Sequence, residues 1–412
     1  MLFACPKLEP GADLETVRIV LVAETFLPAT NGVVNCVLHI AEELVAAGDS
    51  PVVVAPEGGP ESVPVVGGDP VPVHSVPASR VPGYPGLRVA RPGADLIGLL
   101  SRLQPDVVHL ASPFILGWAA ATAIERLGLA SVSAFQTDLS GFLRRYHVGY
   151  GRRATWATLR RIHSRTDLTL APSTASAELL SRHGIGPVAL WRRGVDSEQF
   201  HPRHRSNRVR AELGCANAML VGFVGRLAAE KRVHLLEPLS RLPEVRLLIV
   251  GDGPRRPQLE RAMPTATFLG AKHGIELSEV MASLDLLVNP GANETFCQVV
   301  QEGLASGVPA IVAATGGPLD LVRHGVNGWW WADDDPATLA ALVVSRQRDP
   351  AGLAAAAAQA RGSVVERSWA SVTDDLLGHY RAVIAARGAR SGWIGRRPNP
   401  SADDPLALAR SR

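Results

Sequence analysis

The chain has 412 residues, of which 46% are hydrophobic and 20% are charged, and its net charge is only +3. This length and composition exclude disordered and collagen-like proteins and leave room for roughly two or three domains. The most apolar segment, residues 115–130, is interrupted by Glu125 and Arg126, so we expect no helix that spans a membrane.

The first half of the chain alternates short apolar runs with turns rich in Gly, Pro or Asn and with amphipathic segments. This alternation predicts an α/β domain with parallel strands. The predicted strands are residues 17–23, 51–56, 106–110, 131–135 and 168–171, and the predicted helices are residues 33–47, 115–127, 152–164 and 174–183. Residues 57–93 are rich in Pro, Gly and Val and predict a long excursion that can include a hairpin.

The same cycle resumes after an arginine-rich polar stretch, residues 203–210, which is typical of a connection between domains. The predicted strands are residues 219–224, 245–250, 284–289 and 309–313, and the predicted helices are residues 232–240, 255–262, 276–283 and 297–306. The expected domains are residues 1–195 and 196–368, followed by a helix over 369–386 that returns to the first domain and a disordered tail over 387–412. Two doubly wound domains predict a ligand in the cleft between them, beyond the carboxyl ends of the strands.

The N-terminal segment and the cysteines indicate a cytoplasmic protein. Residues 1–16 carry Lys7 and three acidic side chains but no apolar core, which argues against a secretory signal. The four cysteines lie far apart without a C-x-x-C pair, which favours reduced thiols over a disulfide frame or a zinc site. We therefore expect neither a metal nor a cofactor.

Two cations follow the first strand of the second domain. The loop runs from Gly225 through Arg226 to Lys231, where a helix begins. Arg226 can form a bidentate fork with phosphate oxygens, and Lys231 adds a compact charge. Lysine is rare in this chain, with three lysines among 42 basic residues, which favours a functional role. A solvated surface loop is the alternative.

A second candidate site joins a strand to a helix at residues 290–303. Thr295 and Gln298 fit a capping box, which predicts a helix that begins just after Glu294. The free amides of Phe296, Cys297 and Gln298 would then form an anion pocket. Glu294 and Glu302 would flank this pocket, although the spacing alone also fits a helix cap and a solvated carboxylate.

Two weaker motifs point away from metal and dinucleotide chemistry. Asp333-Asp334-Asp335 precedes Pro336, which favours a helix cap over a metal site. Gly251-Asp252-Gly253 lacks the third glycine of a dinucleotide fingerprint. Gly32 and the pair Gly316-Gly317 follow strands, where glycine permits close approach to a ligand.

Several motifs together resemble one enzyme family. In chain order they are Asn31-Gly32-Val33-Val34, Gly194-Val195-Asp196 with Phe200-His201-Pro202, Gly225-Arg226 with Glu230-Lys231, Gly251-Asp252-Gly253-Pro254 and Glu294-x7-Glu302. This set resembles the family-4 retaining glycosyltransferases of GT-B fold, from about residue 17 to residue 380. Residues 82–85, 135–138 and 294–302 look like an actinobacterial subset, usually described as GDP-mannose-dependent α-mannosyltransferases that act on lipid acceptors.

The resemblance implies a role for each matching residue. The first domain would bind the acceptor and the second the nucleotide sugar. Arg226 and Lys231 resemble the pair that holds the diphosphate, Glu294 the residue that touches the donor sugar, and Glu302 the one that bonds the ribose hydroxyls. Gly32 would face the diphosphate, and Asn31 and Tyr84 the acceptor. Asp138 stands where many members have His, which leaves open whether it holds the sugar, assists the acceptor or shapes the pocket.

A basic segment offers a surface for the acceptor's membrane. Residues 141–165 contain seven arginines with Tyr146, Tyr150 and Trp156, and no acidic residue. If the segment is helical, it places charge and aromatics as expected for a helix that rests on the inner face of the plasma membrane. A solvated face is the alternative, and no motif accompanies it that would indicate a nucleic-acid partner.

Three classes of function remain open at this point. The first is a glycosyltransferase that moves a hexose, by the resemblance mannose from GDP-mannose, to a glycolipid of the cell envelope. A variant of this reading uses a UDP-sugar and a soluble secondary metabolite. The second is a sugar-nucleotide epimerase or phosphorylase of the same architecture. The third is a basic binding protein without enzymatic activity.

Overall fold

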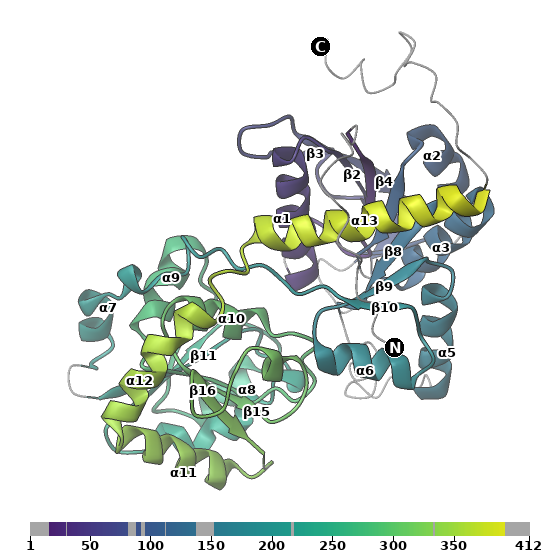
Figure 1. Ribbon diagram of the computed structural model, residues 1–412. Helices are drawn as coiled ribbons and strands as arrows, with labels where there is room; N and C mark the ends of the chain where they lie inside the picture. The colour runs from purple at the N-terminus through teal and green to yellow at the C-terminus, as the bar shows by residue number, and fades with distance from the viewer. Residues whose placement is uncertain are drawn as a thin grey trace.

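The computed structural model describes residues 16–29, 31–80, 88–91, 95–111, 113–136, 152–215, 218–332 and 334–391. The chain forms two lobes, each built around a parallel sheet, with a long C-terminal helix lying along the first lobe (Figure 1). Two expected site residues, Tyr84 and Asp138, lie outside the described residues, as does residue Asp333.

The first sheet has eight strands in the order β10-β9-β8-β7-β1-β2-β4-β3. Its strands are β1 (Arg18–Val22), β2 (Ser50–Pro56), β3 (Ser62–Val63), β4 (Val71–Val76), β7 (Val107–Leu110), β8 (Ala130–Ala134), β9 (Leu168–Ala171) and β10 (Val188–Leu190), with α1 (Gly32–Ala46), α2 (Leu96–Leu103), α3 (Ile115–Leu127), α5 (Arg152–His163) and α6 (Thr174–Arg182) between them. All neighbours pair in parallel except β3 and β4. The predicted strands and helices of this half are confirmed to within two residues at each end.

The segment after β2 is more regular than predicted. β4 joins the main sheet in parallel to β2 and forms an antiparallel hairpin with β3. A separate pair, β5 (Ala78–Arg80) and β6 (Arg88–Ala90), is also antiparallel. Valines that alternate toward the core, Val71 and Val73, explain why this proline-rich stretch still forms a sheet strand.

The second sheet has six parallel strands in the order β13-β12-β11-β14-β15-β16. Its strands are β11 (Met219–Val224), β12 (Val245–Val250), β13 (Thr267–Gly270), β14 (Leu286–Asn289), β15 (Ala310–Ala313) and β16 (Gly328–Trp331). The α-helices of this half are α7 (Asn207–Glu212), α8 (Arg256–Ala262), α9 (Gly274–Ser283), α10 (Gln298–Ala305), α11 (Pro336–Gln347) and α12 (Pro350–Ala360), and the 3-10 helices are η1 (Pro202–His204), η2 (Ala229–Lys231), η3 (Val233–Arg241), η4 (Gly317–Asp320) and η5 (Arg361–Ser363). The four strands predicted here are therefore confirmed, and β13 and β16 were not predicted.

The predicted α-helix over residues 232–240 is a 3-10 helix, η3. Pro238 lies inside it, and a proline both lacks the backbone donor and clashes with the preceding turn of an α-helix. The helix-cap reading of the acidic run is confirmed for Asp335, whose Oδ1 accepts a hydrogen bond from the Ala337 amide at the start of α11.

The final helix, α13 (Trp369–Ser391), extends five residues beyond the predicted end at residue 386. Its buried face, with Leu376 and Tyr380 fully covered, packs into the core of the first lobe beside α1 and β8. The Trp191 indole donates to the Val372 carbonyl at 2.8 Å, and Tyr380 Oη lies 2.6 Å from His109 Nδ1. The expected tail from residue 387 is thus wrong at its start, because Arg387 still belongs to α13 and pairs with Asp167 at 3.0 Å.

The chain crosses between the lobes twice at one place. The Val195 amide donates to the Arg367 carbonyl at 2.9 Å, and a side chain at Gly194 would collide with the Trp369 backbone. We propose the domain boundaries near residues 195 and 368 on this basis. Within the described part of the chain, no helix is both long and apolar enough to cross a membrane.

Candidate active site

The loop after β11 is held by the turn after β12. The Leu227 amide donates to the Asp252 carbonyl at 2.8 Å, and a Cβ at Gly251 would lie 2.0 Å from the Gly225 carbonyl oxygen. The glycines of this turn therefore let two backbones approach each other. This scaffold leaves the Arg226 side chain exposed beyond the carboxyl end of β11.

Lys231 and Glu294 come together from the segments that follow two neighbouring parallel strands, β11 and β14. Lys231 lies at the end of η2, and its Nζ is 2.6 Å from Glu294 Oε1. Only 25% of the Lys231 side chain and 14% of the Glu294 side chain are exposed. Burial is the largest single influence and lowers the pKa of the Lys231 ammonium, but Glu294, Cys297 and Glu230 together raise that pKa by more, so the lysine is charged.

The loop that carries Glu294 is fixed from beneath. Asn289 Oδ1 accepts from the Gly291 amide at 3.1 Å, and Asn289 Nδ2 lies 3.2 Å from Cys297 Sγ. The Gly317 amide donates to the Glu294 carbonyl at 2.8 Å, and a Cβ at Gly316 would lie 2.7 Å from that oxygen. Gly316 and Gly317 thus allow their own backbone to pack closely against the loop of Glu294. The sequence had predicted that these glycines allow close approach of a ligand.

The predicted capping box is wrong. Helix α10 begins at Gln298, and its N-cap is Cys297, which has φ 79° and makes no side-chain cap. Thr295 Oγ1 donates to the Gln136 carbonyl at 2.9 Å, and Gln298 Nε2 donates to the Gly194 carbonyl at 2.8 Å. Tertiary partners from the first domain therefore outcompete the local cap.

The side chains of Phe296 and Cys297 belong to the core of the second domain rather than to a pocket, since they are 2% and 6% exposed. Only their backbone amides remain available to a ligand. Burial, and then the nearby Glu294 carboxylate, raise the pKa of the Cys297 thiol well above its usual value. A protonated, buried thiol is a poor nucleophile.

Glu302 is half-buried in the second turn of α10. Burial raises the pKa of its carboxyl group to about 7. A carboxyl group whose titration is moved into the neutral range is a common feature of functional sites. Its neighbour on the same helix, Gln301, is fully buried and donates to the Arg193 carbonyl at 3.0 Å.

The first domain contributes the start of α1 and the loop after β8. Asn31 is the N-cap of α1, and its Oδ1 accepts from the amides of Val33 and Val34 at 2.9 and 3.1 Å. Gly32 is exposed, and its carbonyl accepts from Arg193 Nη1 at 2.7 Å. The Asn31 side chain, which we expected to contact the acceptor, thus also caps a helix.

Three polar residues with little exposure were missed from the sequence. They are Arg193, the capping carboxylate Glu24, which accepts from four amides at the start of α3 at 3.0–3.1 Å, and Asp320, which bridges the domains. Arg193 and Asp320 gave no signal, because arginines are abundant and a single aspartate after a glycine pair is unremarkable. Glu24 directly follows the first predicted strand, and that position was its only clue.

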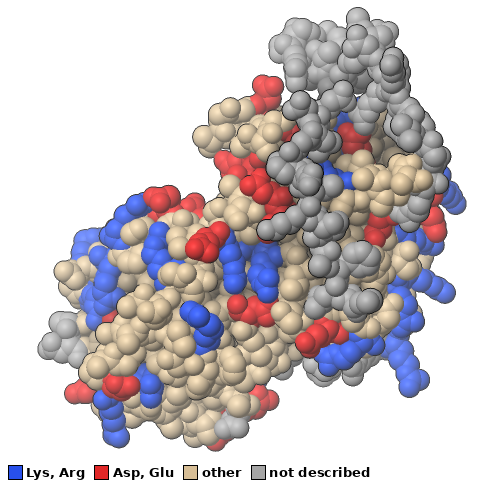
Figure 2. Space-filling model, viewed as in Figure 1, with Lys and Arg blue, Asp and Glu red and all other residues tan. Residues whose placement is uncertain are grey.

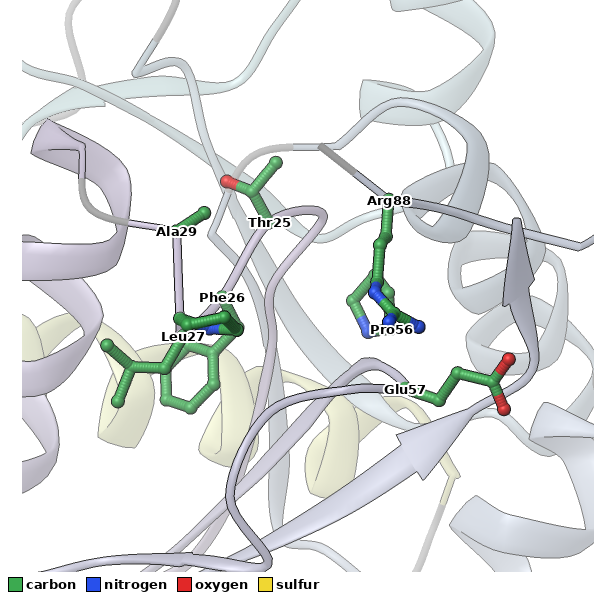
Figure 3. Close-up of a pocket in the computed structure, with 8 residues that line it drawn as sticks. Thr25, Phe26, Leu27, Ala29, Pro56, Glu57 and Arg88 are labelled. Carbon is green, nitrogen blue, oxygen red and sulfur yellow. The ribbon is translucent and has the colours of Figure 1, made fainter. Parts of the chain in front are cut away.

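A small pocket lies beside this first-domain loop (Figure 3). It is lined by Thr25, Phe26, Leu27, Pro28, Ala29, Pro56, Glu57 and Arg88. Arg88 extends toward Pro56 (Figure 3). The pocket lies beside the carboxyl ends of β1 and β2, where α/β sheets bind ligands, but the Glu57 carboxylate points away from it and accepts from the Ala78 amide at 3.2 Å.

Comparison with known proteins identifies the family. The model of Glycosyltransferase Family 4 matches residues 30–199, and the model of the glycosyl transferases group 1 matches residues 218–349. The chain is 43% identical over 384 residues to a GDP-mannose-dependent alpha-mannosyltransferase of Mycolicibacterium smegmatis, covering 91% of this chain and 100% of that protein. The chain belongs to glycosyltransferase family 4. It is a glycosyltransferase, as the sequence motifs predicted.

A second relative agrees with the family-4 assignment, and a solved structure agrees with the fold. A protein of the same description from Mycobacterium tuberculosis is 44% identical over 377 residues, covering 90% of this chain and 98% of that protein. Sucrose-phosphate synthase from Thermosynechococcus elongatus superposes with a TM-score of 0.73 at 19% identity, over 89% of this chain and 99% of that one. Figure 1 and this superposition confirm the GT-B fold of the family-4 chain.

Proposed function

We propose that the protein transfers mannose from GDP-mannose to a lipid or glycolipid acceptor, with retention of configuration, in cell-envelope biosynthesis in the cytoplasm. The observation that carries the proposal is the 43% identity over the full length of a GDP-mannose-dependent alpha-mannosyltransferase. The partly buried Lys231–Glu294 pair and the exposed Arg226 of the same loop as Lys231 support a site for a nucleotide diphosphate and its sugar.

The charges of this site suit the departure of a diphosphate. When the glycosidic bond breaks, negative charge develops on the diphosphate and positive charge spreads over the sugar ring. Arg226, Lys231 and the first amides of α10, from Phe296 to Gln298, would stabilise the diphosphate in the transition state. No step requires a metal in this scheme, because the fixed cations carry the positive charge.

The two glutamates would hold the rest of the donor. Glu294 would contact the hydroxyls of the sugar while it keeps Lys231 charged, since its Oε1 already holds Lys231 Nζ at 2.6 Å. Glu302 would accept hydrogen bonds from the ribose hydroxyls in its ionised form. Gly32 would face the diphosphate, and Asn31, Tyr84 and Asp138 would contact the acceptor.

A donor panel tests the proposal. Thermal shift is measured with GDP-mannose, GDP, UDP-glucose and UDP, because a bound ligand raises the melting temperature by mass action. We expect GDP-mannose and GDP to stabilise the protein, and GDP to be released only when a lipid acceptor is added. Protection by UDP-sugars alone would refute the donor, and release of an epimer or free sugar without acceptor would indicate an epimerase.

We also propose that the lipid acceptor is reached through contact between α5 and an anionic membrane surface. Arg153, Arg160 and Arg161 are exposed on α5, and Figure 2 shows basic side chains gathered around this part of the first domain. Trp156 does not belong to that face: it is 4% exposed and stacks on His183 at 3.7 Å between ring centroids. The proposed contact therefore relies on charge, and residues 141–151 of the basic segment lie outside the described residues.

Co-sedimentation with vesicles tests the membrane contact. The double variant Arg153→Gln with Arg161→Gln should bind vesicles of phosphatidylglycerol several-fold more weakly than the parent, because each cation near an anionic surface contributes about 1 kcal/mol. The exposed Arg246 on β12 provides the control, and Arg246→Gln should bind as the parent does. Equal binding by the double variant and the parent would remove α5 from the contact.

A further inference from the structure

Arg193 is a buried cation that joins two loops of the first domain. Arg193 is only 7% exposed. Nη1 donates to the Gly32 carbonyl at 2.7 Å, and Nη2 donates to Gln136 Oε1 at 2.7 Å. One planar guanidinium therefore fixes the start of α1 relative to the loop after β8, a geometry that a lysine cannot reproduce.

The charge of Arg193 is not neutralised by the groups that it contacts. Both hydrogen-bond partners are neutral, and among the described residues no carboxylate forms an ion pair with it. The first turn of α1 also contains no acidic side chain, so its own residues offer no counter-charge to the positive end of this helix. A buried unpaired cation is costly, and it persists only where something else requires it.

The backbone of the same residue is attached to the second domain. The carbonyls of Arg193 and Gly194 accept from Gln301 Nε2 and Gln298 Nε2, at 3.0 and 2.8 Å. Gln136 completes the connection, because its carbonyl accepts from Thr295 Oγ1 at 2.9 Å. Arg193 thus links Gly32 of the first domain to the helix that follows Glu294 in the second.

We infer that Arg193 is a positioning residue of the transfer reaction. Its fork holds Gly32 and Gln136 in register with α10, and its un-neutralised charge lies behind the start of α1, where it attracts the diphosphate of the donor. The inference rests on the proposed function in one respect, namely that an anionic nucleotide sugar binds between Gly32 and the loop of Glu294. The two roles of Arg193 can be tested separately. Loss of its two hydrogen bonds should lower kcat, and loss of its charge should raise the KM for the donor.

Gln136→Glu tests the charge while it keeps the shape of the site. The new carboxylate still accepts the hydrogen bond of Arg193, but it neutralises the guanidinium at 2.7 Å. We expect the KM for GDP-mannose to rise about tenfold, with a melting temperature equal to or above that of the parent. A KM within about twofold of the parent value would overturn the inference.

Arg193→Lys tests the fork while it keeps the charge. A single ammonium cannot hold both Gly32 and Gln136, so kcat should fall about tenfold or more while the KM for the donor stays near the parent value. Arg193→Met should show both defects. Parent-like kcat in Arg193→Lys would overturn the inference, and this conservative variant is the one that retains folding if Arg193→Met does not.

The matched control is Arg361, another arginine with only neutral hydrogen-bond acceptors, the backbone carbonyls of Phe200, Ala305 and Ser197 at 2.8–3.2 Å. Arg361→Met should lower the melting temperature without a change in kcat or in the KM for the donor. If the parent uses another nucleotide sugar than GDP-mannose, the same variants are measured with that donor. The diphosphate is common to all of them, so failure of the proposed donor and failure of the role of Arg193 give different results.

Discussion

Lys231 and Glu294 depend on each other at the level of single residues. The carboxylate helps to keep the partly buried ammonium charged, and the ammonium offsets the cost of partly burying the carboxylate. Donor binding would bring a diphosphate to a lysine whose charge is already established, so no proton needs to move when the ligand arrives.

Replacement of Lys231 by Met should therefore affect catalysis first. We expect kcat to fall about 100-fold, on the order of 3 kcal/mol in barrier, because a preorganised donor to the leaving group is lost. The measurement is the initial rate of GDP release at saturating acceptor. Lys272, which pairs with Glu276 on an exposed helix face, is the control, and Lys272→Met should leave kcat unchanged. A kcat for Lys231→Met within about threefold of the parent would contradict the role of the lysine.

Glu302 should make stability and donor binding depend on pH. Because burial raises the pKa of its carboxyl group from 4.5 to about 7, the folded protein binds this proton more tightly than the unfolded chain does. This contribution to stability is complete below about pH 4.5 and is lost as the pH rises toward 7. Donor affinity should change in the opposite sense, since the ionised carboxylate is the better acceptor of ribose hydroxyls.

Glu302→Gln separates these two effects. The melting temperature of the variant should fall less between pH 5 and 8 than that of the parent, and its KM for the donor should lose the decrease that we expect near about pH 7. Differential scanning fluorimetry and initial rates over this range are the measurements. The exposed Glu276 on α9 is the control, and Glu276→Gln should keep both profiles. Identical profiles for Glu302→Gln and the parent would show that another group titrates.

At the scale of elements, Asp320 of η4 caps a helix of the other domain. Its Oδ2 accepts from the amide and the hydroxyl of Thr174 at the start of α6, each at 3.0 Å, and from Arg192 Nη2 at 3.1 Å. A carboxylate at the N-terminus of a helix also interacts favourably with the helix dipole. This contact fixes the second domain against α6 beside the candidate active site.

Loss of this cap should weaken the contact between the domains. We expect Asp320→Ala to cost about 2 kcal/mol in the free energy of unfolding, because the Thr174 amide and Arg192 both lose their acceptor. Limited proteolysis of the segments near residues 192 and 367, where the chain crosses between domains, should accelerate. Asp69, exposed in the first domain, is the control for the loss of an acidic side chain. Equal proteolysis rates for Asp320→Ala and the parent would show that the contact of Asp320 with Thr174 and Arg192 does not hold the two domains together.

At the scale of the whole molecule, the end of the chain stabilises its beginning. Helix α13 follows the second domain in sequence, but its apolar face is part of the core under the first sheet. Tyr380 closes this core with the hydrogen bond to His109, whose pKa burial lowers to about 3, so the histidine is neutral there. The first domain is therefore complete only when the C-terminal helix has docked.

Leu376→Ala tests this dependence. Leu376 is fully buried, and its truncation should cost about 3 kcal/mol. Hydrogen exchange should accelerate in β1 and β8 of the first sheet, whereas β11 and β12 should exchange as in the parent. Asp374→Ala on the exposed side of the same helix is the control. Faster exchange in both domains, or in neither, would contradict the assignment of α13 to the first core.

The sequence by itself determined the two parallel sheets, the α/β order, the family and the two charged loops. It could do so because these features depend on local patterns: valines and leucines in short runs make buried strands, and glycine with a following cation makes a loop open to a phosphate. The parallel pairing of β4 with β2, the 3-10 helix at Pro238 and the last residues of α13 show the limit of such patterns.

Only the tertiary structure decided which side chains act together. Thr295 and Gln298 have the spacing of a capping box, but distant residues supply better partners. Thr295 bonds to Gln136, which is 159 residues away in sequence, and Gln298 bonds to Gly194, which is 104 residues away. The contact between Lys231 and Glu294 spans 63 residues, and that between Arg193 and Gly32 spans 161. A local pattern carries no information about a partner that the fold brings from a distant part of the chain, and for this reason these contacts had to be found in the structure.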